Sequence, residues 1–105
     1  MAYDLEAFSD EPIKFDVEFQ GKTLTHHVKA VSLDDFFSSM KGSTNPTANM
    51  RRTFRELLLD EDQQPLSKDW IEKLLTRPAL IPLGLKINAA INSALGLDEL
   101  AAKKG

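Results

Sequence analysis

Two adjacent histidines, His26 and His27, are the first residues that could define a chemical site, because imidazole is a common metal ligand. They fall in a stretch that alternates like a β-strand, and neighbours on a strand point to opposite faces. The chain has no other histidine and no cysteine, so the four ligands of a zinc site are not expected. We therefore predict a structural or surface role for both histidines and no metal site.

Residues 60–64, with the sequence DEDQQ, resemble the start of a calcium-binding loop. Such a loop needs glycine at its sixth position and a bidentate glutamate at its twelfth. Pro65 and Ile71 stand at those positions. We therefore predict a solvated turn between two helices.

Three arginines, Arg51, Arg52 and Arg55, could contact phosphate groups from one helix. The alternative is a solvated face that pairs with Glu56 and with the acidic turn at residues 60–64. The formal net charge of the chain is −3 and its sequence pI is about 5.3. An acidic balance disfavours nucleic acid as the main partner, because nucleic-acid-binding domains usually carry a basic patch.

Catalytic residues are not indicated by any motif in the chain. Asp34 and Asp35 are adjacent on a predicted helix, so their carboxylates do not face each other. Ser38 and Ser39 have no general base at a recognisable spacing, and no phosphate-binding glycine loop or metalloprotease motif occurs. We therefore expect a protein that is not an enzyme and that binds no cofactor.

Length and composition predict one soluble domain. The chain has 105 residues, of which 42% are hydrophobic and 28% charged. The first residues lack the basic and apolar regions of a signal peptide. The longest apolar stretch, residues 79–85, is interrupted by Pro82 and Gly84, so no membrane-spanning helix is expected. These features favour a cytoplasmic protein.

The predicted fold is of the α+β class, with an N-terminal β-hairpin followed by about four short amphipathic helices. Residues 1–11 are expected to form a flexible arm, and residues 12–97 a single domain. Apolar and polar residues alternate on both sides of Gly21, which predicts a hairpin over residues 13–31. Because an isolated hairpin is marginally stable, it must pack on the helices or pair with another copy through its edge.

Helical periodicity and helix-terminal residues define the rest of the domain. Ser32 and Ser67 fit N-caps, Leu66 and Ile71 fit a hydrophobic staple, Pro82 fits a first helical position and Gly96 fits a C-cap. The predicted helices span residues 33–40, 48–59, 68–75 and 82–95. A loop is expected at residues 41–47, and a C-terminal tail at residues 98–105.

Four apolar residues do not fit the predicted core stripes. Leu85 lies off the stripe of its helix, and Leu59, Leu80 and Ile81 lie near helix ends. An exposed patch of such residues would mark a binding site. We therefore take them, together with Arg51, Arg52 and Arg55, as candidate partner-binding residues.

The order of these patterns resembles the tail assembly chaperones of long-tailed bacteriophages. The resemblance covers about residues 13–97. It comprises the hairpin sequence IKFDVEFQGK at 13–22, the helix start SLDDFF at 32–37, the segment LLLDEDQQPL at 57–66, the helix WIEKLL at 70–75, and a helix rich in Leu, Ile, Ala and Asn before Gly96. These are loose patterns in a shared order, and none of them is a chemical signature.

The resemblance implies a chaperone of the host cell cytoplasm that is absent from the mature virion. It would bind the phage tape measure protein during tail morphogenesis, help to recruit the tail-tube protein, and act as a homo-oligomer without catalytic residues. One alternative is a structural head–tail or tail-completion component of the virion. Another is a small nucleic-acid-binding regulator that uses the three arginines.

Overall fold

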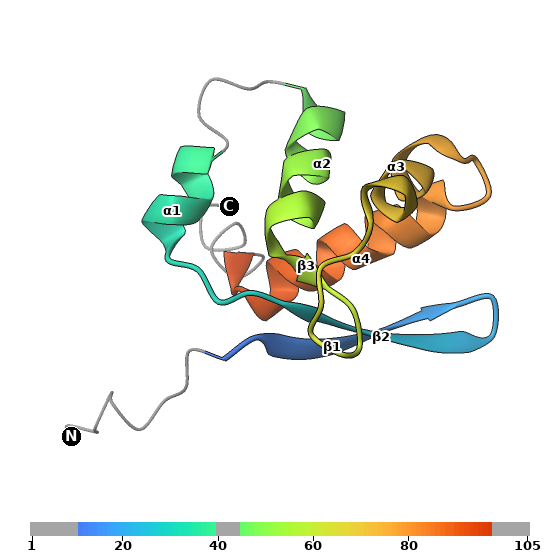
Figure 1. Cartoon of the computed structure of the whole chain (residues 1–105), viewed down its shortest axis with the longest axis horizontal. Coiled ribbons are helices and arrows are strands. Elements are labelled where there is room, and N and C mark those ends of the chain that lie inside the picture. The colour runs from blue at the N-terminus through green and yellow to red at the C-terminus, as the bar shows by residue number, and fades with distance from the viewer. Residues whose placement is uncertain (1–10, 40–44, 98–105) are drawn as a thin grey trace, which may run out of the picture.

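A β-hairpin, a short third strand and four helices make up the described part of the chain (Figure 1). The computed structural model describes residues 11–39 and 45–97; the predicted arm (apart from Glu11), residues 40–44 and the predicted tail lie outside them. The elements are β1 (Ile13–Phe19), β2 (Lys22–Val28), α1 (Leu33–Ser39), α2 (Pro46–Leu57), β3 (Leu58–Leu59), α3 (Lys68–Thr76) and α4 (Ile81–Ala94). The predicted α+β class is confirmed.

The hairpin turns at Gln20 and Gly21, whose φ angles are 51° and 77°. Positive φ at both central residues is the geometry of a type I′ turn, which matches the twist of the flanking strands. The antiparallel register pairs Phe19 with Lys22 at the turn and Ile13 with Val28 at the open end. β2 thus ends at Val28, not at residue 31 as predicted. The Lys29 N–H points away from β1 and donates to the Leu57 carbonyl oxygen at 2.9 Å.

The end of α2 differs from the prediction because the chain leaves the helix at Leu58. Leu58 and Leu59 pair with Val28 and His27 and so form β3 on the second edge of β2. The predicted helix end at residue 59 is therefore wrong: local periodicity favours the helix, but the β2 edge offers backbone partners to these two residues.

The start of α2 also lies earlier than predicted, at Pro46 rather than residue 48. The Asn45 side-chain oxygen accepts hydrogen bonds from Thr47 N at 2.9 Å and from Ala48 N at 3.3 Å. An asparagine cap followed by proline is a strong helix start, so residues 45–47 do not belong to the predicted loop.

Capping residues of the other helices mostly agree with prediction. Ser32 accepts a hydrogen bond from Asp35 N, and Ser67 accepts one from Trp70 N, both at 3.1 Å. Gly96 has φ of +78° directly after the C-cap of α4. α4 begins at Ile81, so Pro82 occupies the second helical position rather than the first.

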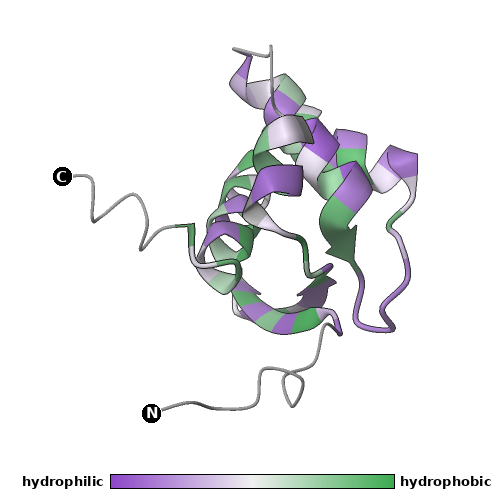
Figure 2. Cartoon of the chain, turned by 90° about the vertical axis from the view of Figure 1, so that its left-hand side faces the viewer, coloured by the Kyte–Doolittle hydropathy of each residue, from purple (hydrophilic) through white to green (hydrophobic). Residues whose placement is uncertain are grey.

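The core lies around α4, which runs between the hairpin on one side and α2 and α3 on the other (Figure 1). One face of the sheet contributes Val17 and Val28 to it. The helices contribute the remaining buried apolar side chains: Phe36, Phe54, Leu57, Ile71, Leu74, Leu83, Ile87 and Ile91; β3 adds Leu58. Figure 2 shows the change from the hydrophobic β3 to the hydrophilic segment that follows it.

Candidate partner-binding surfaces

α4 carries apolar side chains on two faces. Leu83, Ile87 and Ile91 are at most 2% exposed and form the core face. Ile81 and Leu85, one helical turn apart, are 39% and 55% exposed and lie on the other side. Both residues are therefore exposed, and their role in binding a partner stays a prediction. We call these two residues the outer face of α4.

The other two apolar candidates do not lie in the open. Leu80 is the N-cap residue of α4 and is partly buried against the core. Leu59 is only 4% exposed, pairs with His27 and bridges to Pro65. The prediction of an exposed Leu59 is therefore wrong, because the segment after β3 folds back over it.

That segment, residues 60–65, is a structured turn. The Asp60 carboxylate accepts hydrogen bonds from Asp62 N at 2.8 Å and from Gln64 N at 2.9 Å, and Asp60 N donates to Gln64 O at 2.8 Å. The turn joins a strand to a helix, not two helices as predicted. The Asp60 carboxylate holds two backbone amides, and in residues 11–39 and 45–97 no group of three or more metal-ligating side chains comes together.

The two histidines lie on opposite faces of β2, as predicted, and both are buried. His27 Nδ1 lies 2.9 Å from the Asp60 carbonyl oxygen and donates a hydrogen bond to it, which fixes the acidic turn to the outer side of the sheet. His26 is on the core side, where its ring stacks on Phe15 with centroids 5.8 Å apart.

The burial of His26 affects its protonation. Desolvation lowers its pKa below the ordinary value of 6.5, although the Leu24 backbone and the charges of Asp60 and Glu61 act in the opposite direction. Its Nδ1 is buried and has no hydrogen-bond partner in the described structure. Both observations favour a neutral, structural histidine.

The arginines pair with a residue that the sequence interpretation missed. Arg51 forms a two-pronged ion pair with Glu72 of α3, with Nε–Oε2 of 2.7 Å and Nη2–Oε1 of 3.1 Å. Arg55 Nη2 lies 3.7 Å from the same carboxylate. Glu72, and not Glu56 or the acidic turn, is therefore their partner.

This pairing changes the charge of the predicted basic surface. The hydrogen bond from Arg51 lowers the pKa of Glu72, and the carboxylate raises the pKa of Arg51. Two of the three arginines thus share one negative charge, and Arg52 is exposed beside them. The arrangement ties α2 to α3 and reduces the net positive charge offered to a phosphate backbone. No spacing rule could have found Glu72, since it lies 21 residues from Arg51.

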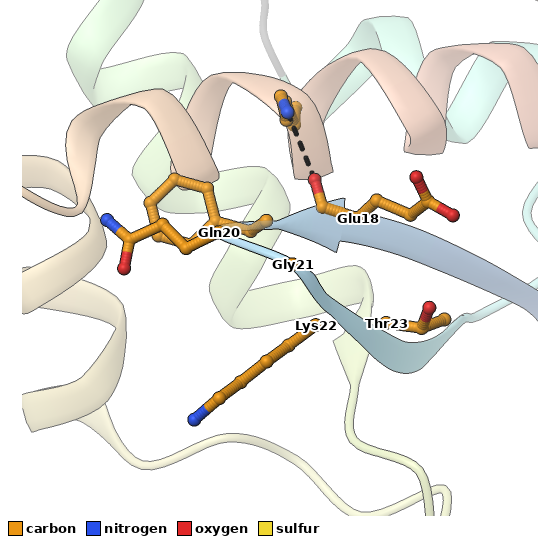
Figure 3. A pocket seen from close by; sticks show the side chains of 7 residues that line it. Glu18, Gln20, Gly21, Lys22 and Thr23 are labelled. Carbon is orange, nitrogen blue, oxygen red and sulfur yellow. Dashed lines mark hydrogen bonds between the residues drawn. The ribbon is translucent and has the colours of Figure 1, made fainter.

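A polar pocket lies beside the hairpin turn, between the sheet and α4 (Figure 3). Lys86 of α4 donates from Nζ to the Glu18 carbonyl oxygen at 3.0 Å. Gln20, Gly21 and Lys22 line the pocket around the turn. Among the described residues that line the pocket, the charged side chains are those of Glu18, Lys22 and Lys86.

Two further exposed apolar residues were not among the candidates. Phe37 of α1 is 50% exposed, and its ring packs edge-on against Phe36. Ile13, at the start of β1, is 36% exposed although it lies on the core side of the hairpin. Alternation predicts an inward-facing Ile13 but does not show that the core ends before it.

Among the described residues, no single helix is long and apolar enough to cross a membrane; α3 and α4 meet the length and composition criteria only as a pair bent by 109°.

Comparisons with protein families, with curated proteins and with solved structures find no match to this chain. Of the four apolar residues predicted to bind a partner, Ile81 and Leu85, the outer face of α4, are the two that are exposed.

Proposed function

We propose that this chain is a tail assembly chaperone of a long-tailed bacteriophage that acts by protein–protein contact in the host cytoplasm. The outer face of α4 would bind an apolar stripe of the helical tape measure protein. The observation that carries the proposal is the second apolar face of α4. A helix that needs one buried face for its own domain usually presents polar residues to solvent, whereas here Ile81 and Leu85 face outward.

The physical mode would be the packing of one amphipathic helix against another. A single short face contributes a modest affinity. Several chaperone copies along one long client would give reversible coverage through effective concentration. The assignment to a phage tail rests on the resemblance in the order of sequence patterns, and the mode of contact rests on α4.

Co-expression with a candidate client tests the proposal. The client to be tested is a tape measure protein, sought as a long helical reading frame beside this gene, and the measured quantity is the fraction of client that stays soluble. We expect Leu85→Lys to reduce that fraction to the level without chaperone. Phe37→Lys is the matched control, because Phe37 is similarly exposed but lies on α1. Equal loss with both variants, or no loss with Leu85→Lys, contradicts the assignment of the binding face.

Mass spectrometry of mature particles separates the chaperone from a virion component. The chaperone is expected to be absent or far below the copy number of tail subunits. Its presence in stoichiometric amounts would refute the chaperone function and favour a structural one.

A further inference from the structure

β1 is an edge strand whose outer side is open in the described structure. The sheet order is β1-β2-β3, so β2 is central and β3 lies on its far side. β1 runs for seven residues in continuous register, without a bulge or an internal proline. Edge strands of this kind offer unpaired backbone groups to another strand, and proteins usually interrupt or cover them.

The turn geometry identifies the backbone groups that point outward. Phe19 and Lys22 close a two-residue turn, so this pair is the hydrogen-bonded one. Because hydrogen-bonded and non-hydrogen-bonded pairs alternate, the N–H and C=O groups of Lys14, Asp16 and Glu18 point away from β2. The contact from Lys86 Nζ to the Glu18 carbonyl agrees with this orientation (Figure 3). That lysine covers one end of the edge, and no other described residue bonds to the outward groups of Lys14 and Asp16.

We propose that a second copy of this chain pairs with β1 in antiparallel fashion about a two-fold axis at Phe15. In this register Lys14 of each copy lies opposite Asp16 of the other, which gives two opposite-charge pairs. A shift that centres the axis on Asp16 places two aspartates opposite each other. A shift centred on Val17 opposes Asp16 to Glu18, and one centred on Lys14 opposes two lysines. Like charges directly opposite are destabilising, so only the Phe15 register is complementary without a like-charge pair.

The core side of the strand is compatible with this register. The axis at Phe15 brings the two Phe15 side chains together and places Ile13 of each copy opposite Val17 of the other. All are apolar cross-strand pairs, which stabilise a sheet. Pairing would cover part of Ile13, which is 36% exposed because the core of one copy ends before it. On the outer face of the strands, Asp16 Oδ1 accepts a hydrogen bond from Thr25 Oγ1 of β2 at 2.8 Å, so Lys14 of the second copy would pair with the other carboxylate oxygen, Oδ2.

The interface is small, so the association is expected to be weak and concentration-dependent. Sedimentation velocity over roughly a hundredfold range of protein concentration measures it. Lys14→Asp alone and Asp16→Lys alone each turn both attractive pairs into repulsive ones, and we expect self-association to weaken about tenfold or more. A mixture of the two variants restores opposite charges at both positions and should associate like the original chain.

Two controls make the register and the surface falsifiable. Glu18→Lys leaves both charge pairs intact, because Glu18 lies opposite Pro12, and should change self-association little. Leu85→Lys changes the outer face of α4 and should also leave it unchanged. Circular dichroism confirms that each variant is folded.

The proposal is overturned by a chain that stays monomeric at every concentration, by single reversals without effect, or by a mixture that fails to associate. A dominant effect of Glu18→Lys would refute the register, and one of Leu85→Lys would refute the surface. These experiments measure self-association and not client binding, so this inference can fail while the proposed function stands, and the reverse.

Discussion

Gly84 offers the sharpest test of how α4 is held against α3. In an ordinary exposed helix, replacing glycine by alanine stabilises the helix by roughly 1 kcal/mol. At Gly84, a Cβ atom would lie 2.7 Å from the Leu74 backbone oxygen, about 0.7 Å short of ordinary contact at 3.4 Å. The obstacle is backbone in a packed helix, not the mobile end of a side chain.

Relief of that overlap requires α3 and α4 to separate where Leu74 and Leu83 are fully buried. Overpacking of a core costs about 1–3 kcal/mol, which exceeds the gain in helix propensity over most of that range. We therefore expect Gly84→Ala to lower the free energy of unfolding by about 1 kcal/mol, and the melting temperature by about 4–8 °C for a domain of this size.

Thermal unfolding followed by circular dichroism measures the effect. Ser93→Ala, an exposed substitution on the same helix, is the control and should raise stability slightly through propensity alone. If Gly84→Ala also raises the melting temperature, then α3 and α4 do not approach as closely as the structure shows, and the reasoning fails.

Three further predictions concern the buried and charged groups. Because burial lowers the pKa of His26, the folded state prefers the neutral ring, so the free energy of unfolding should be highest above about pH 6.5 and should fall as the pH drops from there towards the lower folded-state pKa. His26→Phe should make the free energy of unfolding less dependent on pH in that range, as measured by denaturant titrations at a series of pH values. Leu59→Ala should lower the free energy of unfolding by about 2–4 kcal/mol, whereas Leu85→Ala should change it little; similar values would contradict the burial of Leu59. Arg51 and Glu72 should show a favourable coupling in a double-mutant cycle at low salt that weakens at about 1 M salt, and no coupling would mean that the ion pair is not formed in solution.

The sequence was sufficient to predict the elements that depend on local chemistry. Strict alternation around Gly21 predicted the hairpin, and Ser32 and Ser67 predicted helix starts that the structure contains. Asn45 and Pro46 are an equally strong signal for a helix start, but the neighbouring residues are typical of a loop, so a loop was predicted over residues 41–47. Local rules therefore located the elements to within a few residues.

The errors arose where a distant partner decides the conformation. Leu58 and Leu59 continue the helical pattern in the sequence, but in the structure they pair with the free edge of β2 and form β3. Leu59 was expected at the surface because nothing in the sequence shows that residues 60–65 return over it. Glu72 likewise became visible as the arginine partner only once α2 and α3 lay side by side.

The two proposed surfaces have a joint consequence. In the register centred on Phe15, core-side residues of one β1 lie opposite core-side residues of the other, so both copies of α4 cover the same side of one continuous sheet. The outer faces of the two α4 helices would then act on one client with a raised effective concentration. We expect Lys14→Asp, which leaves Leu85 intact, to weaken client binding to a long tape measure segment but not to a segment that occupies one α4 face. Equal loss for both segments would mean that Lys14 acts in client contact itself and not through pairing of β1.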